Sequence, residues 1–258
     1  MPSREPGDVT CDGVEGYQAI VELAKSDDGV IGLVLGGSRG RGAFVGPTSD
    51  YDVYLIVRDP EPYRHRFPTR HGDPVEVFVL TLDELRAHAG VGSETEWNRY
   101  TFAHVAPVVD KTGGELARIL EEKGRLPVDA ARRIAAEALD SYVNSYYRSV
   151  TNARARVWLA SRLDAAESIP YLFTVLFALD ARVRPYNKYL EWELERFPLR
   201  GDAWRAERLL PTLERIVATG DLQAQQRLFR DLERLARECG HGNVIDSWQP
   251  DIAFLRGG

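Results

Sequence analysis

The chain has 258 residues, which is enough for one large domain or two modest ones with a hydrophobic core. Its composition, 44% hydrophobic and 28% charged, is that of an ordinary globular protein, and its two cysteines, Cys11 and Cys239, are too few for a disulfide framework or a zinc cage. The net charge of −6 argues against a protein that coats nucleic acid, and the lack of a long apolar run or a signal-peptide pattern predicts a cytoplasmic protein without a membrane span.

The first half of the chain predicts a small α/β sheet. Apolar residues at helical spacing predict an initial helix, and three short apolar or β-branched runs predict strands. Thr81 followed by Glu84 has the pattern of a capping box and predicts that a helix starts there. The predicted elements are a helix over 14–27, strands over 30–35, 51–57 and 74–81, and a helix over 81–88.

After Pro127 the pattern is helical throughout. Small or apolar side chains at helical spacing predict one long amphipathic helix over 129–160, and a more apolar run predicts a buried helix over 169–183. Pro185 is expected in the first turn of the next helix. Two more helices are predicted over 203–220 and 221–239, the second capped by Asp221 and closed by Gly240.

These patterns predict an α+β fold with two domains. We expect an N-terminal mixed β-sheet domain over residues 1–125, followed by an all-helical bundle domain over residues 126–258. Because ligand sites favour domain interfaces, the active cleft is expected between the two domains. The sheet domain is expected to be catalytic and the helical domain to bind an acceptor.

The stretch GGSRGRGAFVGPTSDYDV, residues 36–53, joins two predicted strands. It matches G-x-S-x-G over 36–40, but a nucleophile elbow runs from a strand into a helix, and here Gly, Pro, Thr and Ser precede another strand. Gly40, Gly42 and Gly46 lack the spacing of a dinucleotide fingerprint, and no Gly-Lys-Ser/Thr ends a Walker loop. The stretch therefore needs another explanation.

Asp50 and Asp52 would share one face of the second strand, because side chains repeat every two residues. One alternative is a glycine-rich loop with two incidental aspartates, although an unpaired carboxylate within an apolar strand is costly. In the other alternative, the Gly-Ser turn binds a polyphosphate and the aspartates hold a divalent metal such as Mg²⁺. Arg39 or Arg41 would then add positive charge, and Glu76 on the next strand would supply a third carboxylate.

Gly36-Gly37-Ser38, followed by Asp50-x-Asp52 and a distal acid, resembles the signature of the DNA polymerase β-like nucleotidyltransferases. The version in this chain is similar to that of the bacterial antibiotic and minimal nucleotidyltransferases. This resemblance covers the predicted sheet. The segment RPYNKYLEWEL, residues 184–194, more loosely resembles the C-terminal domain of the aminoglycoside-type enzymes.

The resemblance implies a Mg²⁺-dependent enzyme that transfers a nucleoside monophosphate, AMP from ATP as the first choice, to a hydroxyl of a small acceptor and releases pyrophosphate. An aminoglycoside-like antibiotic is the first acceptor to consider, and resistance would be the role. Asp50, Asp52 and Glu76 would be the catalytic and metal-binding residues. The nucleotide would be bound by Gly37, Ser38, Arg39, Arg41 and Lys188.

Three features of the helical half can each be interpreted in two ways, as functional or as structural. Lys188 either grips the triphosphate near the start of a helix or is an ordinary surface lysine. Asp180 is either an acid on the acceptor side or a cap or ion-pair partner of Arg184. A polar row at a spacing of four residues is either a solvated face or a wall of the acceptor pocket. That row consists of Asp140, Asn144, Arg148, Asn152 and Arg156.

Two other functions remain as alternatives. A protein adenylyltransferase of the antitoxin type would use the same residues on a tyrosine, but the long helical half favours a pocket for a small acceptor. A catalytically inactive nucleotide-binding module would not need to keep Asp50, Asp52 and Glu76. The expected partners are therefore a nucleoside triphosphate and a small hydroxylated acceptor, and neither a membrane nor a nucleic acid is expected.

Overall fold

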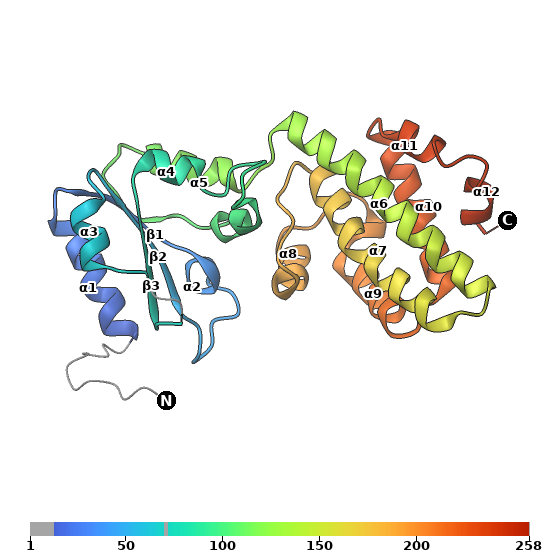
Figure 1. The fold of residues 1–258 in the computed structure, drawn as a ribbon, viewed down its shortest axis with the longest axis horizontal. Coiled ribbons are helices and arrows are strands. Elements are labelled where there is room, and N and C mark those ends of the chain that lie inside the picture. Colours follow the sequence, from blue (N-terminus) through green and yellow to red (C-terminus); the bar gives the residue numbers. More distant parts are fainter. Residues whose placement is uncertain (1–12, 70–71, 258) are drawn as a thin grey trace. The chain divides into compact units, whose positions relative to one another are not determined.

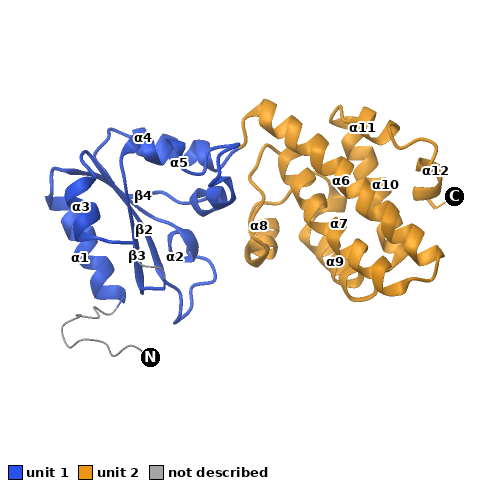
Figure 2. Ribbon diagram, in the orientation of Figure 1, with its two compact units in different colours: residues 1–125 blue, residues 126–258 orange. Residues whose placement is uncertain are grey.

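The structure, a computed structural model, describes residues 13–69 and 72–257, so Cys11 lies outside the described residues. The chain has the predicted α+β fold, with a mixed sheet in its N-terminal part and helices in the rest (Figure 1). It divides into two compact units, Met1–Arg125 and Leu126–Gly258 (Figure 2).

Among the described residues of the first unit, four strands form one sheet in the order β3-β2-β1-β4. The central strand β1 is antiparallel to both β2 and β4, whereas β2 and β3 are parallel, so the sheet is mixed as predicted. The strands are β1 (Val30–Leu35), β2 (Tyr51–Val57), β3 (Val75–Leu80) and β4 (Pro107–Asp110).

Helices cover both faces of this sheet (Figure 1). Helices α1 (Gly13–Ser26) and α3 (Glu61–Arg66) pack on the face that carries Leu33, Val53 and Leu55. The opposite face, with Val34, Tyr54 and Ile56, is covered by residues of three other elements. These elements are α4 (Leu82–Ala87), the 3₁₀ helix η1 (Glu96–Phe102) and α5 (Glu115–Lys123). Alternating side chains thus build two small cores on either side of the strands.

The capping box predicted at Thr81 is confirmed. The Thr81 hydroxyl accepts a bond from the Glu84 backbone N–H at 3.1 Å, and the Glu84 carboxylate accepts one from the Thr81 N–H at 2.8 Å. Helix α1 and the first three strands also lie where the sequence predicts them. Five elements of this unit were not predicted, namely α2 (Gly37–Arg41), α3, η1, β4 and α5.

The glycine-rich turn differs from the prediction, because it leads directly into a short helix, α2 (Gly37–Arg41). Gly40 N–H donates to the Gly36 carbonyl at 2.9 Å, and Gly42 ends the turn in the left-handed conformation, with φ +67°. Glycine has poor helix propensity, so the sequence pattern hides this single turn. The expectation that no helix follows the first strand is therefore wrong.

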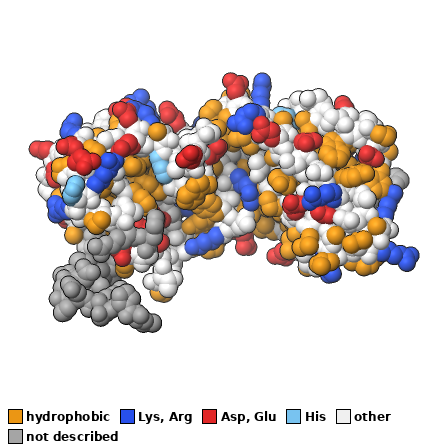
Figure 3. Space-filling model, viewed as in Figure 1, with side chains coloured by type: hydrophobic (Ala, Val, Ile, Leu, Met, Phe, Trp, Pro, Cys, Tyr) orange, Lys and Arg blue, Asp and Glu red, His pale blue; other side chains and the backbone are white. Residues whose placement is uncertain are grey.

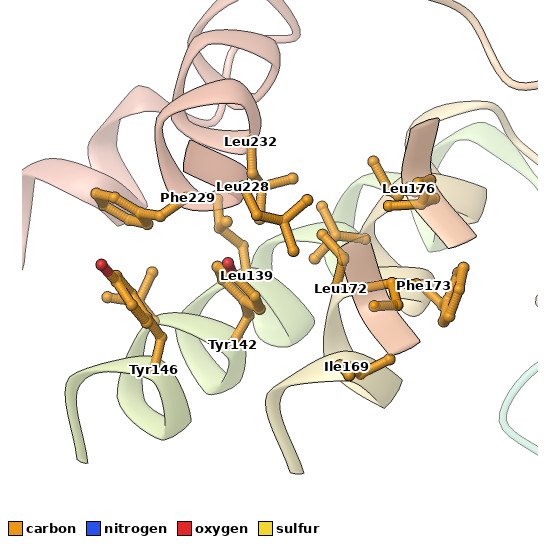
Figure 4. Packing of buried hydrophobic residues seen from close by; sticks show 14 of the residues in the cluster. Leu139, Tyr142, Tyr146, Ile169, Leu172, Phe173, Leu176, Leu228, Phe229 and Leu232 are labelled. Carbon is orange, nitrogen blue, oxygen red and sulfur yellow. The ribbon is translucent and has the colours of Figure 1, made fainter. Parts of the chain in front are cut away.

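The second unit is helical among its described residues (Figure 1). Its core is one large cluster in which α6, α7 and α10 meet (Figure 4). Tyr142 and Tyr146 are buried in it, and the Tyr146 hydroxyl donates to the Leu255 carbonyl at 2.7 Å. The α-helices are α6 (Val128–Arg154), α7 (Trp158–Leu179), α8 (Leu190–Arg196), α9 (Ala206–Thr219), α10 (Leu222–Glu238), α11 (Gly242–Asp246) and α12 (Ile252–Leu255).

The long helix predicted over 129–160 is interrupted. Helix α6 ends at Arg154, Arg156 has φ +60°, and α7 starts at Trp158. The Val157 N–H donates to the Asn152 carbonyl at 2.9 Å and closes the turn. No glycine or proline marks this position, and the apolar spacing continues in phase across it, so the pattern could not indicate the break.

The helix predicted to start at Pro185 starts later. Tyr186 is extended, with φ −62° and ψ 149°, and the 3₁₀ helix η2 (Asn187–Tyr189) precedes α8. Helix α9 likewise begins only at Ala206, after the 3₁₀ helix η3 (Asp202–Trp204). The caps predicted for α10 are confirmed: Asp221 accepts from the Ala224 N–H at 2.9 Å, and Gly240 follows the helix with φ +85°.

One face of the molecule shows a mixture of positive and negative side chains (Figure 3). On the face drawn in Figure 3, Lys and Arg side chains are interspersed with Asp and Glu over each unit. In the part of the chain that the structure describes, no helix is both long and apolar enough to cross a membrane.

Candidate active site

The glycine turn at the end of β1 is held directly against Asp52. The Gly36 N–H donates to the Asp52 carbonyl at 2.8 Å. Gly37 has φ +59°, and a methyl group placed on it would lie 2.2 Å from Oδ2 of Asp52. Only glycine satisfies both the backbone conformation and this close approach. The backbone of the turn therefore packs directly against the Asp52 carboxylate and leaves no room for a side chain at position 37.

Three carboxylates approach one another beside this turn. Asp52 on β2 is paired in register with Glu76 on the parallel strand β3. Asp50 immediately precedes β2 and is exposed. Burial raises the pKa of Asp52 to about 6, and the negative charges of Asp50 and Glu76 add to the rise. Glu76 also accepts a bond from the Gly72 N–H at 2.7 Å.

Asp50 and Asp52 form no ion pair with any residue in the ranges 13–69 and 72–257. Within the same ranges, no three Asp, Glu, His or Cys side chains are arranged as a ready-made metal cluster. Mg²⁺, however, is commonly held by one or two carboxylates together with substrate phosphates and water. The oxygen donors of Asp50 and Asp52 fit that mode of binding, and a cation there would relieve their repulsion.

Arg39 lies on α2 and contacts the two neighbours of Asp50. Its Nε and Nη2 atoms donate to the Ser49 carbonyl at 3.0 and 2.8 Å. Its guanidinium carbon lies 4.0 Å from the centre of the Tyr51 ring. These contacts join the helix after the turn to the chain just before β2. The predicted binding of nucleotide by Arg39 remains a prediction.

Arg41, which was also predicted to bind nucleotide, is buried, with 9% of its surface exposed. Its guanidinium donates to the carbonyls of Tyr100 at 2.6 Å, Ala103 at 3.3 Å and Gly37 at 3.3 Å. It also lies 4.3 Å from the Tyr100 ring centre. These contacts tie α2 to η1, and the predicted binding of nucleotide by Arg41 remains a prediction.

The 3₁₀ helix η1 supports the turn, and sequence patterns missed it. A methyl group on Gly36 would lie 2.8 Å from Cγ2 of Thr101. Asn98 accepts from the Thr101 hydroxyl at 2.6 Å and donates to the Tyr54 hydroxyl at 3.1 Å. Short 3₁₀ segments have no 3.6-residue apolar periodicity, so only the aromatic content of EWNRYTF marked this stretch.

Ser38 is half-buried within α2, one residue beyond Gly37. Lys188 belongs to the second unit, where it is exposed in η2 and its Nζ lies 5.5 Å from the Tyr189 ring centre. Lys188 therefore lies in the 3₁₀ turn that leads into α8 at Leu190, rather than one turn into a helix that begins at Pro185 as predicted. Its binding of nucleotide stays a prediction.

The polar row on α6 connects it to other helices. Arg148 forms ion pairs with Asp164 at 2.7 Å and with Glu167, both on α7. Asn152 donates to Asp164 at 2.7 Å, and Asp140 accepts from the Trp248 indole at 2.9 Å. Four of the five side chains in the row are exposed, as a solvated face predicts, and the contacts above are made at that face. The side chains hold helices of the bundle together.

Asp180 lies just past the end of α7 rather than within it. It forms ion pairs with Arg200 at 2.9 Å and Arg182 at 3.4 Å, so its partners differ from the predicted Arg184. Arg184 instead donates to Asn187 at 2.9 Å. These contacts give Asp180 a role in closing the turn after α7.

The helical unit also contains an open groove of about 480 Å³ between α8 and α9. Apolar side chains such as Leu194 and Leu210 line it, together with Arg205 and four glutamates. The glutamates that line the groove are Glu191, Glu195, Glu207 and Glu214. None of the four forms an ion pair with another described residue.

Comparison with known proteins gives a distant likeness. No protein-family model and no curated protein matches the chain. The chain is similar to a solved structure of a nucleotidyltransferase-like protein from Exiguobacterium sibiricum 255-15, with 10% sequence identity and a TM-score of 0.38. The alignment covers 84% of this chain and 78% of the other. A likeness at this level is too weak to assign a function, which has to be inferred from the turn and the three carboxylates.

Proposed function

We propose that the protein is a Mg²⁺-dependent nucleotidyltransferase, which transfers AMP from ATP to a hydroxyl of a small acceptor and releases pyrophosphate. The observation that carries this proposal is the half-buried Asp52, which contacts the Gly36–Gly37 turn and whose pKa is raised to about 6 by burial and by Asp50 and Glu76. A carboxylate kept among like charges is costly for folding alone. A bound cation and phosphate would account for it.

In the proposed reaction, the backbone N–H groups of the turn and the hydroxyl of Ser38 bind the triphosphate. Asp50 and Asp52 hold the metal, which when bound neutralises phosphate charge and stabilises the charge that develops during transfer. The acceptor oxygen attacks the α-phosphorus, and the bond from that phosphorus to the bridging oxygen breaks. Pyrophosphate leaves, and the proton of the acceptor hydroxyl passes to a nearby carboxylate, for which we propose Glu76.

The helical unit is proposed to bind the acceptor, and Lys188 is proposed as a further nucleotide-binding residue. The charges of the helical unit nearly cancel, with 19 Lys and Arg against 18 Asp and Glu, so the case for a positively charged acceptor, such as an aminoglycoside-like compound, rests on local negative charge. The glutamates of the α8–α9 groove add negative charge to this unit. Modification of a protein tyrosine is the second candidate, and an inactive nucleotide-binding module is the third.

The proposal is tested by incubating the protein with Mg²⁺, labelled ATP and separate panels of aminoglycosides, lincosamides, purified proteins and cell extract. A labelled small molecule together with released pyrophosphate is the expected result. A labelled protein would favour the second candidate, whereas binding of Mg²⁺-nucleotide without any product would favour the third. If calorimetry with a non-hydrolysable ATP analogue shows no binding of Mg²⁺-nucleotide to the wild type, the proposed function is wrong.

A further inference from the structure

We propose that Arg39 is a positioning residue for Asp50, and that it does not bind the triphosphate. The two residues that flank Asp50 along the chain are the two residues that Arg39 contacts. Two of its N–H groups converge on the Ser49 carbonyl, at 3.0 and 2.8 Å, and its guanidinium lies over the Tyr51 ring at 4.0 Å. Tyr51 is itself stacked on Tyr17 at 4.7 Å. Arg39 thereby holds the backbone on both sides of the carboxylate.

Asp50 needs such support more than Asp52 does. Asp52 lies inside β2, bonded through its carbonyl to Gly36 and paired in register with Glu76. Asp50 is exposed, lies outside the strand and follows a loop that contains Gly42 and Gly46. The free energy needed to order such a flexible segment is large enough to weaken binding of a metal that depends on it.

The contact leaves the Asp50 carboxylate available. Arg39 bonds the carbonyl of Ser49, and it forms no ion pair with Asp50 among the described residues. An arginine paired with the carboxylate would compete with a metal for its oxygens. An arginine on the neighbouring carbonyl fixes the position of the carboxylate and leaves its charge free for a cation.

The alternative is that Arg39 binds phosphate, and the two roles differ in their dependence on metal. A phosphate-binding arginine strengthens nucleotide binding with or without Mg²⁺, whereas a residue that positions a metal ligand strengthens it only when Mg²⁺ is present. They also differ in their tolerance of lysine. Lysine keeps the charge but cannot reproduce the paired N–H groups or the stacked plane of arginine.

The experiment compares wild type with Arg39→Met, Arg39→Lys and the control Arg58→Met, which alters an exposed arginine of the same unit. Hydrogen exchange is measured without ligand at the amides in residues 43–50 that are hydrogen-bonded, namely those of Ala43, Gly46 and Ser49. Calorimetry then gives the Kd of a non-hydrolysable ATP analogue with Mg²⁺ and, separately, with EDTA. The calorimetric part rests on the proposed function, whereas the exchange part does not.

In both Arg39 variants these amides should exchange about tenfold faster than in wild type. A hydrogen bond from a charged donor contributes roughly 1.4 kcal/mol or more, which corresponds to a factor of about ten. Both should also weaken Mg²⁺-nucleotide binding about tenfold and leave binding in EDTA within about twofold of wild type. Arg58→Met should match wild type throughout.

Three results would overturn the proposal. The first is an equal loss of affinity in Mg²⁺ and in EDTA with Arg39→Met, which would make Arg39 a phosphate ligand. The second is wild-type Mg²⁺-nucleotide binding in Arg39→Lys. The third is unchanged exchange over residues 43–50 in both variants. If the wild type binds no nucleotide, the proposed function fails, and the exchange result alone shows whether Arg39 orders the segment around Asp50.

Discussion

Asp52 in the sheet unit and Glu233 in the helical unit are both sheltered carboxylates, yet their pKa values shift in opposite directions. The Glu233 pKa is lowered, chiefly by its bond from Arg256, while burial opposes the change and a bond from Arg237 assists it. The Asp52 pKa is raised to about 6 by burial and by two neighbouring carboxylates. Glu233 has the partners that a structural charge requires, whereas Asp52 is surrounded by like charge.

The same contrast holds beyond this pair. Glu193, 1% exposed in the helical unit, forms an ion pair with Arg182. In the sheet unit, neither Asp50 nor Asp52 forms an ion pair with a residue in the described ranges. Removing one partner of a buried ion pair leaves an uncompensated charge, so both partners are needed for the fold, whereas a carboxylate kept among like charges is a candidate for binding a cation. This contrast locates the candidate site better than any pocket does.

The largest effect is expected from Asp52→Asn on catalysis. The substitution keeps the shape of the side chain and removes the charge that would hold the metal, so the transfer rate should fall at least about 100-fold. The measurement is the rate of labelled product formation with an acceptor identified from the panel. Asp28→Asn, an exposed position of the same unit, is the matched control and should retain activity. Nearly normal activity in Asp52→Asn would remove Asp52 from the site.

Glu233→Gln is expected to lower stability and to leave function unchanged, whereas Asp52→Asn is expected to abolish function. Losing charge-assisted bonds from Arg237 and Arg256 should lower the free energy of unfolding by about 2–3 kcal/mol. Nucleotide binding should be unchanged. Urea unfolding at pH 7 measures the loss, with the exposed Glu238→Gln on the same helix as control. A Glu233→Gln protein as stable as wild type would show that pairing is not what distinguishes the two carboxylates.

Asp52→Asn should also make the metal-free protein more stable at neutral pH. The folded pKa of about 6 exceeds the ordinary value of 3.8, so the folded state binds more protons between these values and loses stability as pH rises through them. The gain from Asp52→Asn should be about 1–2 kcal/mol at pH 7, because water screens part of the shift, and should vanish near pH 4. Urea unfolding in EDTA at both pH values tests this, and an equal gain at both would contradict it.

The smallest effect concerns a buried cation, Lys123, which is 3% exposed and donates to the carbonyls of Arg86 and His88. Burial, assisted by Arg99, lowers its pKa from 10.5 to about 8. The unfolded chain therefore binds more protons between pH 8 and 10.5, and stability should rise with pH in this range. In Lys123→Met, the free energy of unfolding should rise less with pH than in wild type. The two rises between pH 8 and 9 should differ by about 1 kcal/mol or less. Identical slopes of unfolding free energy against pH would show that Lys123 does not contribute.

Much of the fold could be predicted because its signals are local. Helix α1, the first three strands, the capping box at Thr81 and the caps of α10 depend on residues a few positions apart. The break at Arg156 has no such signal, since a non-glycine residue there takes a positive φ. Strand β4 has only four residues and starts with a proline, so neither alternation nor composition marked it.

The candidate site was only partly readable from sequence. Spacing alone placed Asp50 and Asp52 on one side of a strand. The register that sets Asp52 beside Glu76, and the fit of Gly37 against a carboxylate, are tertiary contacts. The predicted functions of Arg39 and Arg41 rest on their charge, whereas their hydrogen bonds to carbonyl oxygens, up to 62 residues away in the chain, are tertiary contacts that no local pattern marks.

The strand order β3-β2-β1-β4 has a consequence for how the protein is made. The strand that ends in the glycine turn, β1, is central, and one of its two neighbours is β4, which begins only at Pro107. During synthesis, β1 and β2 emerge long before β4 and must wait for it with one row of N–H and C=O groups unpaired. A fragment that ends before Pro107 would keep Asp50, Asp52 and Glu76 and still expose an aggregation-prone strand edge. Expression of fragments ending before Pro107 and after Lys123, with solubility as the measurement, would show how much of the chain this sheet requires.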